Sequence, residues 1–415
     1  MKQYMRLVHV IVGITGAGGC GFPRPADVGD DGGLSNSICT ANQADRCDGS
    51  DLVSCNSDGT AEVSENCSLG CSVTGLRCND LDPSNGLAPY LDMTGGEPDL
   101  DLGTMATINT DDGTVMVDGK PVIVYSMLLG QSSAPTIRVF IGHSLTATDV
   151  TITGSNAFAV VSNGDLTIGG VFAASANGIF TPGPGAFNDG TCQGAEGAIV
   201  NGGVIGGAGG GGFGFAGGRG GTATNDNGIA TGGAGGTATG SPTLVPLRGG
   251  CDGGRVGVRL FGFGGGAMQL VSRTRITVSG IVAANGSSGS GGGSGGGILF
   301  EAPVVEVSGS LVANGGAGAG GCLFPKAGED GRLDAMPATG GDPCDTTGVK
   351  GGNGGAGNSG AGNGASINQA GLSFALAGYG GGGVGRIRVN TLSGGFHRTG
   401  GLFSPNPSTG AVTTR

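Results

Sequence analysis

Cysteines are the residues of this chain with the most evident chemistry, and there are eleven of them. Six lie within residues 39–78, a segment with almost no large apolar side chains that could form a core. No C-x2-C pair and no histidine occurs there, which argues against zinc and for disulfides that replace a hydrophobic core. These six are Cys39, Cys47, Cys55, Cys67, Cys71 and Cys78. We expect them to form three bridges, and the sequence leaves their pairing open.

Two more pairs of cysteines bracket parts of glycine-rich stretches, namely Cys192 with Cys251 and Cys322 with Cys344. Together with the six above they make an even number, as expected for disulfides in a protein exported from the cytoplasm. We therefore predict five disulfides and no metal site in this chain.

Cys20 stands apart from the other cysteines, at the end of an N-terminal export signal over residues 1–20. Lys2 and Arg6 are basic, residues 7–14 are apolar, and Ala-Gly-Gly precedes the cysteine. These small residues resemble the lipobox of bacterial lipoproteins, which implies cleavage before Cys20 and its acylation. A plain secretory signal is the alternative interpretation. Residues 21–38 are rich in Gly, Pro and Asp and are predicted to be a flexible tether.

Charged and aromatic residues are scarce outside these segments, which bears on the reactions that the chain could perform. The formal net charge is −11, and this argues against nucleic acid as a partner. The strand-like repeats carry few charges, which are Asp165, Glu301, Glu306, Arg273 and Arg275. A polysaccharide lyase or hydrolase needs paired carboxylates or a cluster of Asp, Lys and Arg, and it gains from aromatic sugar platforms. The chain has no Trp and only four Tyr, so we expect no enzymatic activity and no cofactor.

Three copies of one pattern form the framework that must position these residues. They begin at Phe158, Met268 and Gly297, and they align without a gap at offsets of 110 and 29. Apolar residues alternate with polar ones on both sides of a glycine, which predicts strands with one buried face separated by a tight bend. Two columns of the alignment are Leu166, Ile276, Val305 and Ile168, Val278, Val307. We expect these side chains to point inward, and Thr277 and Glu306 to point outward.

Repeated strand–bend–strand units favour an all-β fold, a parallel β-helix-like solenoid of few coils over residues 157–395. A β-sandwich is the alternative. Residues 79–156 contain short β-like runs and are predicted to cap the solenoid, while residues 396–415 read as a loop-like tail. Residues near Ile387 resemble one more coil, with Ile387 matching Leu299 at an offset of 88. Arg386 and Arg388 would then point to solvent.

Glycine dominates two long insertions, residues 178–266 and 315–383. The whole chain contains 98 glycines, and ordering a glycine backbone is unusually unfavourable because of its large conformational entropy. The insertions are therefore either mobile or built from extended left-handed polyglycine helices bonded side by side through their amides. The second option favours glycine at every third position, as at Gly203, Gly206, Gly209 and Gly212.

Several stretches together resemble glycine-rich surface lipoproteins of myxobacterial type. They are the lipobox-like start, CDGSDLVSCNSDG, GGGAMQLVSRTRITVSGIVAANG and GGGGVGRIRVNTLSGG. The resemblance implies a location at the outer membrane or cell surface and a membrane partner through a lipid anchor on Cys20, but no reaction. We expect a non-enzymatic structural or adhesive protein whose glycine-rich loops contact extracellular polysaccharide or other cells. A β-helical polysaccharide lyase or hydrolase is the alternative.

Overall fold

The computed structural model describes residues 38–415, except residues 202, 258–261 and 345. The predicted export signal, Cys20 and nearly all of the predicted tether lie outside the described residues. The fold is all-β, as the sequence predicts, and helix within the described ranges is confined to three short turns between residues 84 and 96. These are the 3-10 helices η1 (Ser84–Gly86) and η2 (Asp92–Gly96) and the single-turn helix α1 (Ala88–Leu91).

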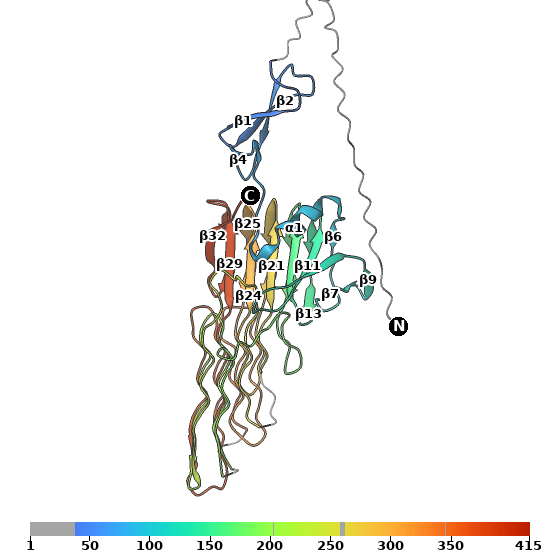
Figure 1. The fold of residues 1–415 in the computed structure, drawn as a ribbon. Coiled ribbons are helices and arrows are strands. Elements are labelled where there is room, and N and C mark those ends of the chain that lie inside the picture. The colour runs from blue at the N-terminus through green and yellow to red at the C-terminus, as the bar shows by residue number, and fades with distance from the viewer. Residues whose placement is uncertain (1–37, 202, 258–261, 345) are drawn as a thin grey trace, which may run out of the picture.

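Three sheets form the central body of the molecule (Figure 1). The first contains, in spatial order, β10 (Tyr125–Leu129), β11 (Ile137–Gly142), β14 (Ala157–Ser162), β21 (Ala267–Ser272), β24 (Gly297–Glu301), β29 (Arg386–Thr391) and β32 (Ser408–Ala411). The second contains β30 (Phe396–Arg398), β25 (Val304–Val307), β22 (Arg275–Val278), β15 (Leu166–Ile168), β12 (Leu145–Ala147) and β6 (Leu100–Asp101). The third contains β31 (Leu402–Ser404), β26 (Ser310–Val312), β23 (Ile281–Ala283), β16 (Val171–Ala173), β13 (Val150–Thr153), β7 (Ala106–Asn109), β8 (Val115–Val117) and β9 (Lys120–Val122).

Most strand pairs in these sheets are parallel, and each repeat contributes one strand to each sheet. Antiparallel pairs occur where β10, β8 and β9 extend the first and third sheets at one edge, so both of these sheets are mixed. Residues of the predicted cap thus cover this edge, as an open row of backbone groups requires.

The predicted columns of the repeats are confirmed in the second sheet. Leu166 pairs with Ile276 and Ile276 with Val305, and the column that starts at Ile168 continues in the same way. The inward-facing side chains of both columns are at most 1% exposed, whereas Thr277 and Glu306 are partly exposed. Alternation of polar and apolar residues therefore assigned the two faces of this sheet correctly.

The ungapped alignment is wrong by one residue in the first sheet. Met268 pairs with Ile298 rather than with Gly297, because the corner between β24 and β25 is one residue shorter than the corner between β21 and β22. Ile387 likewise pairs with Ile298 and not with Leu299. Ile298 and Ile387 consequently face the main core, while Leu299 lies on the opposite face of the sheet.

Two regions outside the three copies contribute the same set of strands. In the predicted cap, β11, β12 and β13 pair in parallel with β14, β15 and β16 of the first copy. Residues 396–415, predicted as a loop-like tail, form β30, β31 and β32. Both regions therefore extend the three sheets.

The first sheet is buried on both faces, which explains why β11, β14 and β21 contain no exposed residue. Phe158 and Val160 point into the main core between the sheets, and Ala159 and Val161 point to the other side. There they pack in a second cluster with Leu81, Leu87 and Leu91 from the segment that carries η1 and α1. Strands buried on both faces lose the clean polar alternation that the other strands show.

A small module of five short strands precedes this body. It contains the antiparallel sheet of β1 (Ala44–Asp48), β2 (Asp51–Cys55) and β3 (Glu62–Asn66), and the pair β4 (Cys71–Ser72) and β5 (Arg77–Cys78). β3 is exposed along its whole length, and few of the module's residues are buried. The module lies beyond one end of the body in Figure 1, and the disulfides described below stabilise it.

The glycine-rich insertions form a bundle of extended segments that projects from the opposite end of the body (Figure 1). Backbone amides bond between neighbouring segments every third residue. Gly206, Gly209 and Gly212 donate to Ala198, Ala195 and Cys192 at 2.8–2.9 Å. In the same segment, Gly207 and Gly210 donate to Gly221 and Gly218, whereas Ile205, Ala208 and Gly211 accept from Ala377, Gly380 and Gly383.

This three-residue period is that of the polyproline II conformation, which lacks hydrogen bonds within one chain. Each segment therefore satisfies its amides through its neighbours, as the polyglycine hypothesis requires, and the alternative of loops without order is wrong for the described residues. Glycine is needed because the backbones approach so closely. A Cβ added to Gly210 would lie 1.9 Å from the carbonyl oxygen of Gly381.

Two small sheets close the far end of this bundle. The first comprises β17 (Ile199–Val200), β18 (Val204–Ile205) and β28 (Ala375–Leu376), and the second β20 (Gly228–Ala230), β19 (Ala223–Asn225) and β27 (Ile367–Asn368). Val204, Ala223 and Ala375 form a small core between them. Segments from both long insertions thus meet at this end. Their paired strands β18 and β28 are about 170 residues apart in the sequence.

Candidate functional site

All ten cysteines within the described residues form disulfides, as predicted. Three bridges lie in the N-terminal module: Cys39–Cys55, Cys47–Cys71 and Cys67–Cys78. The other two are Cys192–Cys251 and Cys322–Cys344 in the glycine-rich insertions. Five disulfides indicate an oxidising environment outside the cytoplasm.

The charged residues of the repeats are engaged in contacts within the fold and do not converge on one cleft. Arg275 pairs with Glu306 at 2.6 Å on the second sheet. Asp165 accepts a hydrogen bond from the Thr274 hydroxyl at 2.5 Å. Across the part of the chain that the structure describes, no group of three or more His, Cys, Asp or Glu side chains could hold a metal ion.

Glu301 is buried at 2% exposure on the outer face of the first sheet. Its carboxylate accepts hydrogen bonds from the Ser84 amide (3.0 Å) and hydroxyl (2.8 Å), from Gln269 (2.6 Å) and from Asn390 (3.0 Å). A buried carboxylate needs such donors to offset its lost hydration. The arrangement ties the η1 segment to three strands, and we assign it a structural role.

A second polar cluster joins the same segment to the end of the sequence. Arg273 donates two hydrogen bonds to Asp80, and Arg415 contacts both Asp80 and Asp92. Burial favours the protonated form of Asp80, but the hydrogen bonds and charge of Arg273 outweigh it and hold the pKa of Asp80 below its ordinary value. This ion pair network also supports the fold.

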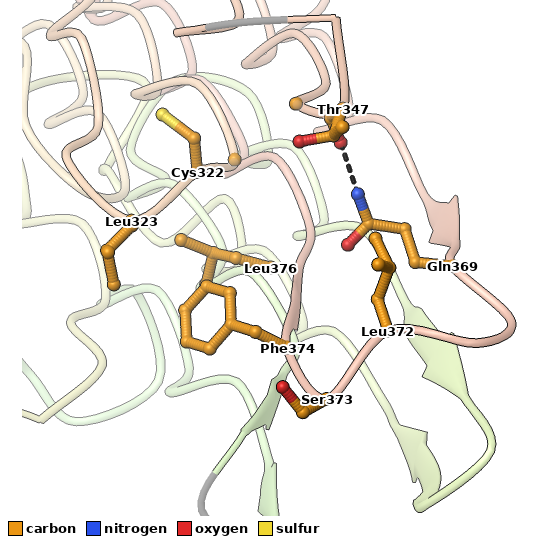
Figure 2. Close-up of a pocket in the computed structure, with 10 residues that line it drawn as sticks. Cys322, Leu323, Thr347, Gln369, Leu372, Ser373, Phe374 and Leu376 are labelled. Carbon is orange, nitrogen blue, oxygen red and sulfur yellow. Dashed lines mark hydrogen bonds between the residues drawn. The ribbon is translucent and has the colours of Figure 1, made fainter.

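A cavity of about 250 Å³ lies near the far end of the bundle, and Figure 2 shows it. Its lining comes from three separated stretches, and the labelled side chains are Cys322, Leu323, Thr347, Gln369, Leu372, Ser373, Phe374 and Leu376. Leu376 is 1% exposed and packs with the partly buried Phe374 in a cluster that also contains Tyr379. Phe374 and Leu376 therefore form a well-packed apolar floor of the cavity.

Neutral polar groups lie beside this apolar floor. The Gln369 side-chain amide donates to the backbone oxygen of Thr347 at 2.5 Å, which fixes its orientation (Figure 2). The Gln369 backbone amide bonds to Thr224 of β19, and this contact anchors the loop to the second small sheet. None of the described residues that line the cavity is charged. Such a mixture of apolar surface and neutral hydrogen-bonding groups suits an uncharged sugar unit.

Large apolar side chains are exposed around the same cavity. Leu323 is 59% exposed, the adjacent Phe324 is 81% exposed, and Leu372 is 46% exposed. The Cys322–Cys344 disulfide fixes the base of the loop that carries the first two. Exposed apolar groups held on an ordered scaffold are a common feature of binding surfaces.

Sequence reasoning did not identify this site. Its members lie in parts of the second insertion that read as low-complexity glycine-rich chain, and they come together only through the bundle. The one available signal was the pair Cys322 and Cys344, because a disulfide within a glycine tract indicates a loop that is held in place.

Comparisons with protein-family models, with curated proteins and with solved structures find no match to this chain. Among the described residues, no helix is long and apolar enough to cross a membrane. Functional conclusions therefore depend on the geometry of the molecule itself.

Proposed function

We propose that this protein is an exported, non-enzymatic surface protein that binds extracellular polysaccharide with the far end of its glycine-rich bundle. The cavity beside Gln369, with its apolar floor and the exposed side chains of Leu323 and Leu372 in its lining, is the observation that carries this proposal. Sugars present both hydroxyl groups and apolar C–H faces, and a site for them combines the two kinds of contact.

The arrangement of the chain supports an outward-facing role for the bundle. The N-terminal module lies at the end of the molecule opposite to the bundle (Figure 1). In our proposal, Cys20 is acylated and residues 21–38 tether the module to the outer membrane. The three sheets then act as a β-helix-like solenoid that holds the bundle away from the membrane, with its far end toward other cells and their polysaccharides.

The backbone of the bundle is ordered, and this supports a role in adhesion over a role as a coat that only fills space at the cell surface. Hydrogen bonds between neighbouring segments and the Cys322–Cys344 disulfide hold the cavity lining in place before any ligand arrives. A preformed site avoids the entropic penalty of ordering loops on binding. Repeated weak contacts from many copies on one cell would add up to firm attachment.

The experiment is a binding measurement on an array of neutral and acidic glycans with the full exported protein. Leu323→Ser and Leu372→Ser are expected to reduce binding to the recognised glycan, because both exposed side chains line the cavity. Ile123→Ser is the matched control, because Ile123 is 97% exposed and directly follows β9, the edge strand of the third sheet, outside the cavity lining. Equal binding by all four proteins, or no glycan bound at all, would reject the proposal.

The same glycans test the enzymatic alternative. After prolonged incubation, a hydrolase would create new reducing ends, and a lyase would create unsaturated uronic acids that absorb ultraviolet light. We expect neither product. Turnover of a bound glycan would replace the adhesive proposal with the β-helical lyase or hydrolase.

A further inference from the structure

Arg386 begins strand β29, where the bundle meets the body, and its guanidinium has no acidic partner among the residues that the structure describes. Arg386 is only partly exposed, and its buried Nε has no hydrogen-bond partner among the described residues. Other arginines of the body are paired: Arg275 with Glu306, and Arg388 with the Asn390 side chain at 2.8 Å. Arg386 and Arg388 lie on the outer face of β29, as alternation predicts, but both are only partly exposed.

A partly buried cation without a partner is unfavourable for folding, because it loses hydration without gaining a compensating contact. Burial lowers the pKa of Arg386, although an arginine remains charged at neutral pH. Groups of this kind are enriched at binding sites, where the ligand supplies the missing partner.

Arg386 lines a cavity of about 140 Å³ whose walls come from four parts of the chain. Phe215 comes from the first insertion and is 44% exposed, and Asn358 comes from the second. Asn406 comes from the segment between β31 and β32, Ser408 begins β32, and both are exposed. The cavity therefore offers one cation, one aromatic ring, two amides and one hydroxyl.

Backbone contacts hold these walls in place. The amides of Gly214 and Phe215 both donate to the oxygen of Val384, at 2.9 and 3.2 Å. The Arg386 amide donates to Gly296 at 2.8 Å, and the Ser408 hydroxyl to the oxygen of Ile387 at 3.3 Å. The ring of Phe215 and the guanidinium of Arg386 are thus carried by directly bonded segments.

We infer that this cavity binds the carboxylate of a uronic acid unit in an acidic polysaccharide, with Arg386 as its ion-pair partner. A guanidinium matches a carboxylate with two parallel hydrogen bonds. Phe215 provides an apolar surface for the sugar ring, and the amides of Asn358 and Asn406 lie where they can meet its hydroxyl groups. This site is separate from the neutral cavity near Gln369.

A carboxylate fits better than a phosphate monoester, which carries up to two negative charges at neutral pH. The cavity contributes one cation, and the protein as a whole carries a formal net charge of −11. One guanidinium is enough to pair one carboxylate, whereas a group with two negative charges would leave one of them unpaired beside an acidic protein.

The test is a titration of the full exported protein with a tetramer of galacturonic acid at low salt. The matched ligand is the same tetramer with its carboxyl groups reduced to alcohols, and inorganic phosphate is the competitor. We expect binding of the acidic tetramer only, weakened by added salt. Arg386→Gln should lower the affinity about tenfold or more, because charge-assisted hydrogen bonds are lost, and Arg386→Lys should lower it less.

Arg275→Gln serves as the control for a general loss of positive charge, and it should bind the acidic tetramer like the unchanged protein. Unfolding temperatures establish that the variants fold, and Arg386→Gln should be no less stable than the original. Unchanged affinity in Arg386→Gln, equal binding of the reduced tetramer, or competition by phosphate at equal concentration would overturn the inference. Leu323→Ser should leave this titration unchanged, so the two sites are tested separately.

Discussion

Asp80 and Arg273 lie 193 residues apart in the sequence and form a two-point ion pair in the structure. Arg273 Nε donates to Asp80 Oδ1 at 2.8 Å, and Arg273 Nη2 donates to Oδ2 at 2.7 Å. The pair connects the segment after the disulfide module to the corner between β21 and β22. Arg415 contacts the same carboxylate at 3.0 Å, so one acidic side chain joins three distant parts of the chain.

Asp80→Asn should therefore lower the free energy of unfolding by about 1–2 kcal/mol, between the values for exposed and buried ion pairs. The reason is that Arg273 and Arg415 would then share only the more exposed carboxylate of Asp92. Urea unfolding with the disulfides intact measures the change. Glu306→Gln breaks the exposed pair with Arg275 and should change the stability by less than about 1 kcal/mol. Equal losses in the two variants would contradict the role of Asp80.

Neighbouring residues of β15 test the assignment of inward and outward faces. Ile168 is fully buried in the main core, whereas Thr167 is exposed. Ile168→Asp would place an unpaired charge in the core, with a loss of several kcal/mol or a failure to fold. Thr167→Asp should change stability by only about 0.5 kcal/mol. Thermal unfolding of both variants gives the comparison.

Thr167 is a better control than Thr277, although both point outward. Thr277 pairs with Glu306, so an added carboxylate there would be repelled. Thr167 pairs with Thr146 and Thr277, which are neutral. If Thr167→Asp were as damaging as Ile168→Asp, the faces of the sheet would have been assigned wrongly.

The strand register of the second sheet could be predicted from sequence, because its paired residues in the three copies stand at the same positions of the ungapped alignment. Leu166, Ile276 and Val305 fall in register at the offsets that an ungapped alignment gives. The first sheet broke that alignment because corners differ in length. Ile137 pairs with Ala157, Leu145 with Leu166 and Val150 with Phe172, at offsets of 20, 21 and 22. When the offset between two repeats changes from one strand to the next, a comparison of sequences without gaps does not detect the repeat.

The candidate sites were beyond prediction for a different reason. Gln369 and Leu323 are neighbours only because glycine-rich segments pack side by side, and no pattern of side chains records which segments are adjacent. Glu301 is similar, since Ser84, which lies 217 residues away, provides its covering hydrogen bonds. Arg386 was correctly placed on the outer face by alternation, but that pattern does not show whether a partner is present.

Acid should weaken the bundle through Asp189, which pairs with Arg248 at 2.9 Å. Burial favours protonation of Asp189, but hydrogen bonds from Cys192, Thr191 and Arg248 outweigh it and hold its pKa well below the ordinary value. A carboxylate with a lowered folded-state pKa adds stability above its unfolded pKa, near 3.9, and loses this contribution as the pH falls toward the folded value. The stability of the protein should thus decline below about pH 4–5.

Asp189→Asn should remove part of this acid sensitivity. The variant is expected to unfold at a lower temperature than the original protein at pH 7, and the difference should shrink at pH 3. Calorimetry at both pH values, with disulfides intact, measures it. A difference that is the same at both values would show that the charge of Asp189 does not contribute.

Close approach of backbones is the feature on which the glycine-rich bundle depends, and one pair of substitutions tests it directly. In Gly210→Ala the new methyl group would lie 1.9 Å from the Gly381 oxygen, so neighbouring segments must separate. We expect a loss of about 1–3 kcal/mol or more, as for other overpacked sites. Gly360→Ala lies in the second insertion and meets nothing within 4 Å. It should leave stability unchanged or raise it by about 0.4–1 kcal/mol, since alanine restricts the unfolded chain.

Hydrogen exchange should show faster exchange around residues 205–221 and 377–383 in Gly210→Ala only. Similar exchange in the two variants would mean that the segments are not in contact, and the rigid presentation of both proposed sites would lose its physical basis.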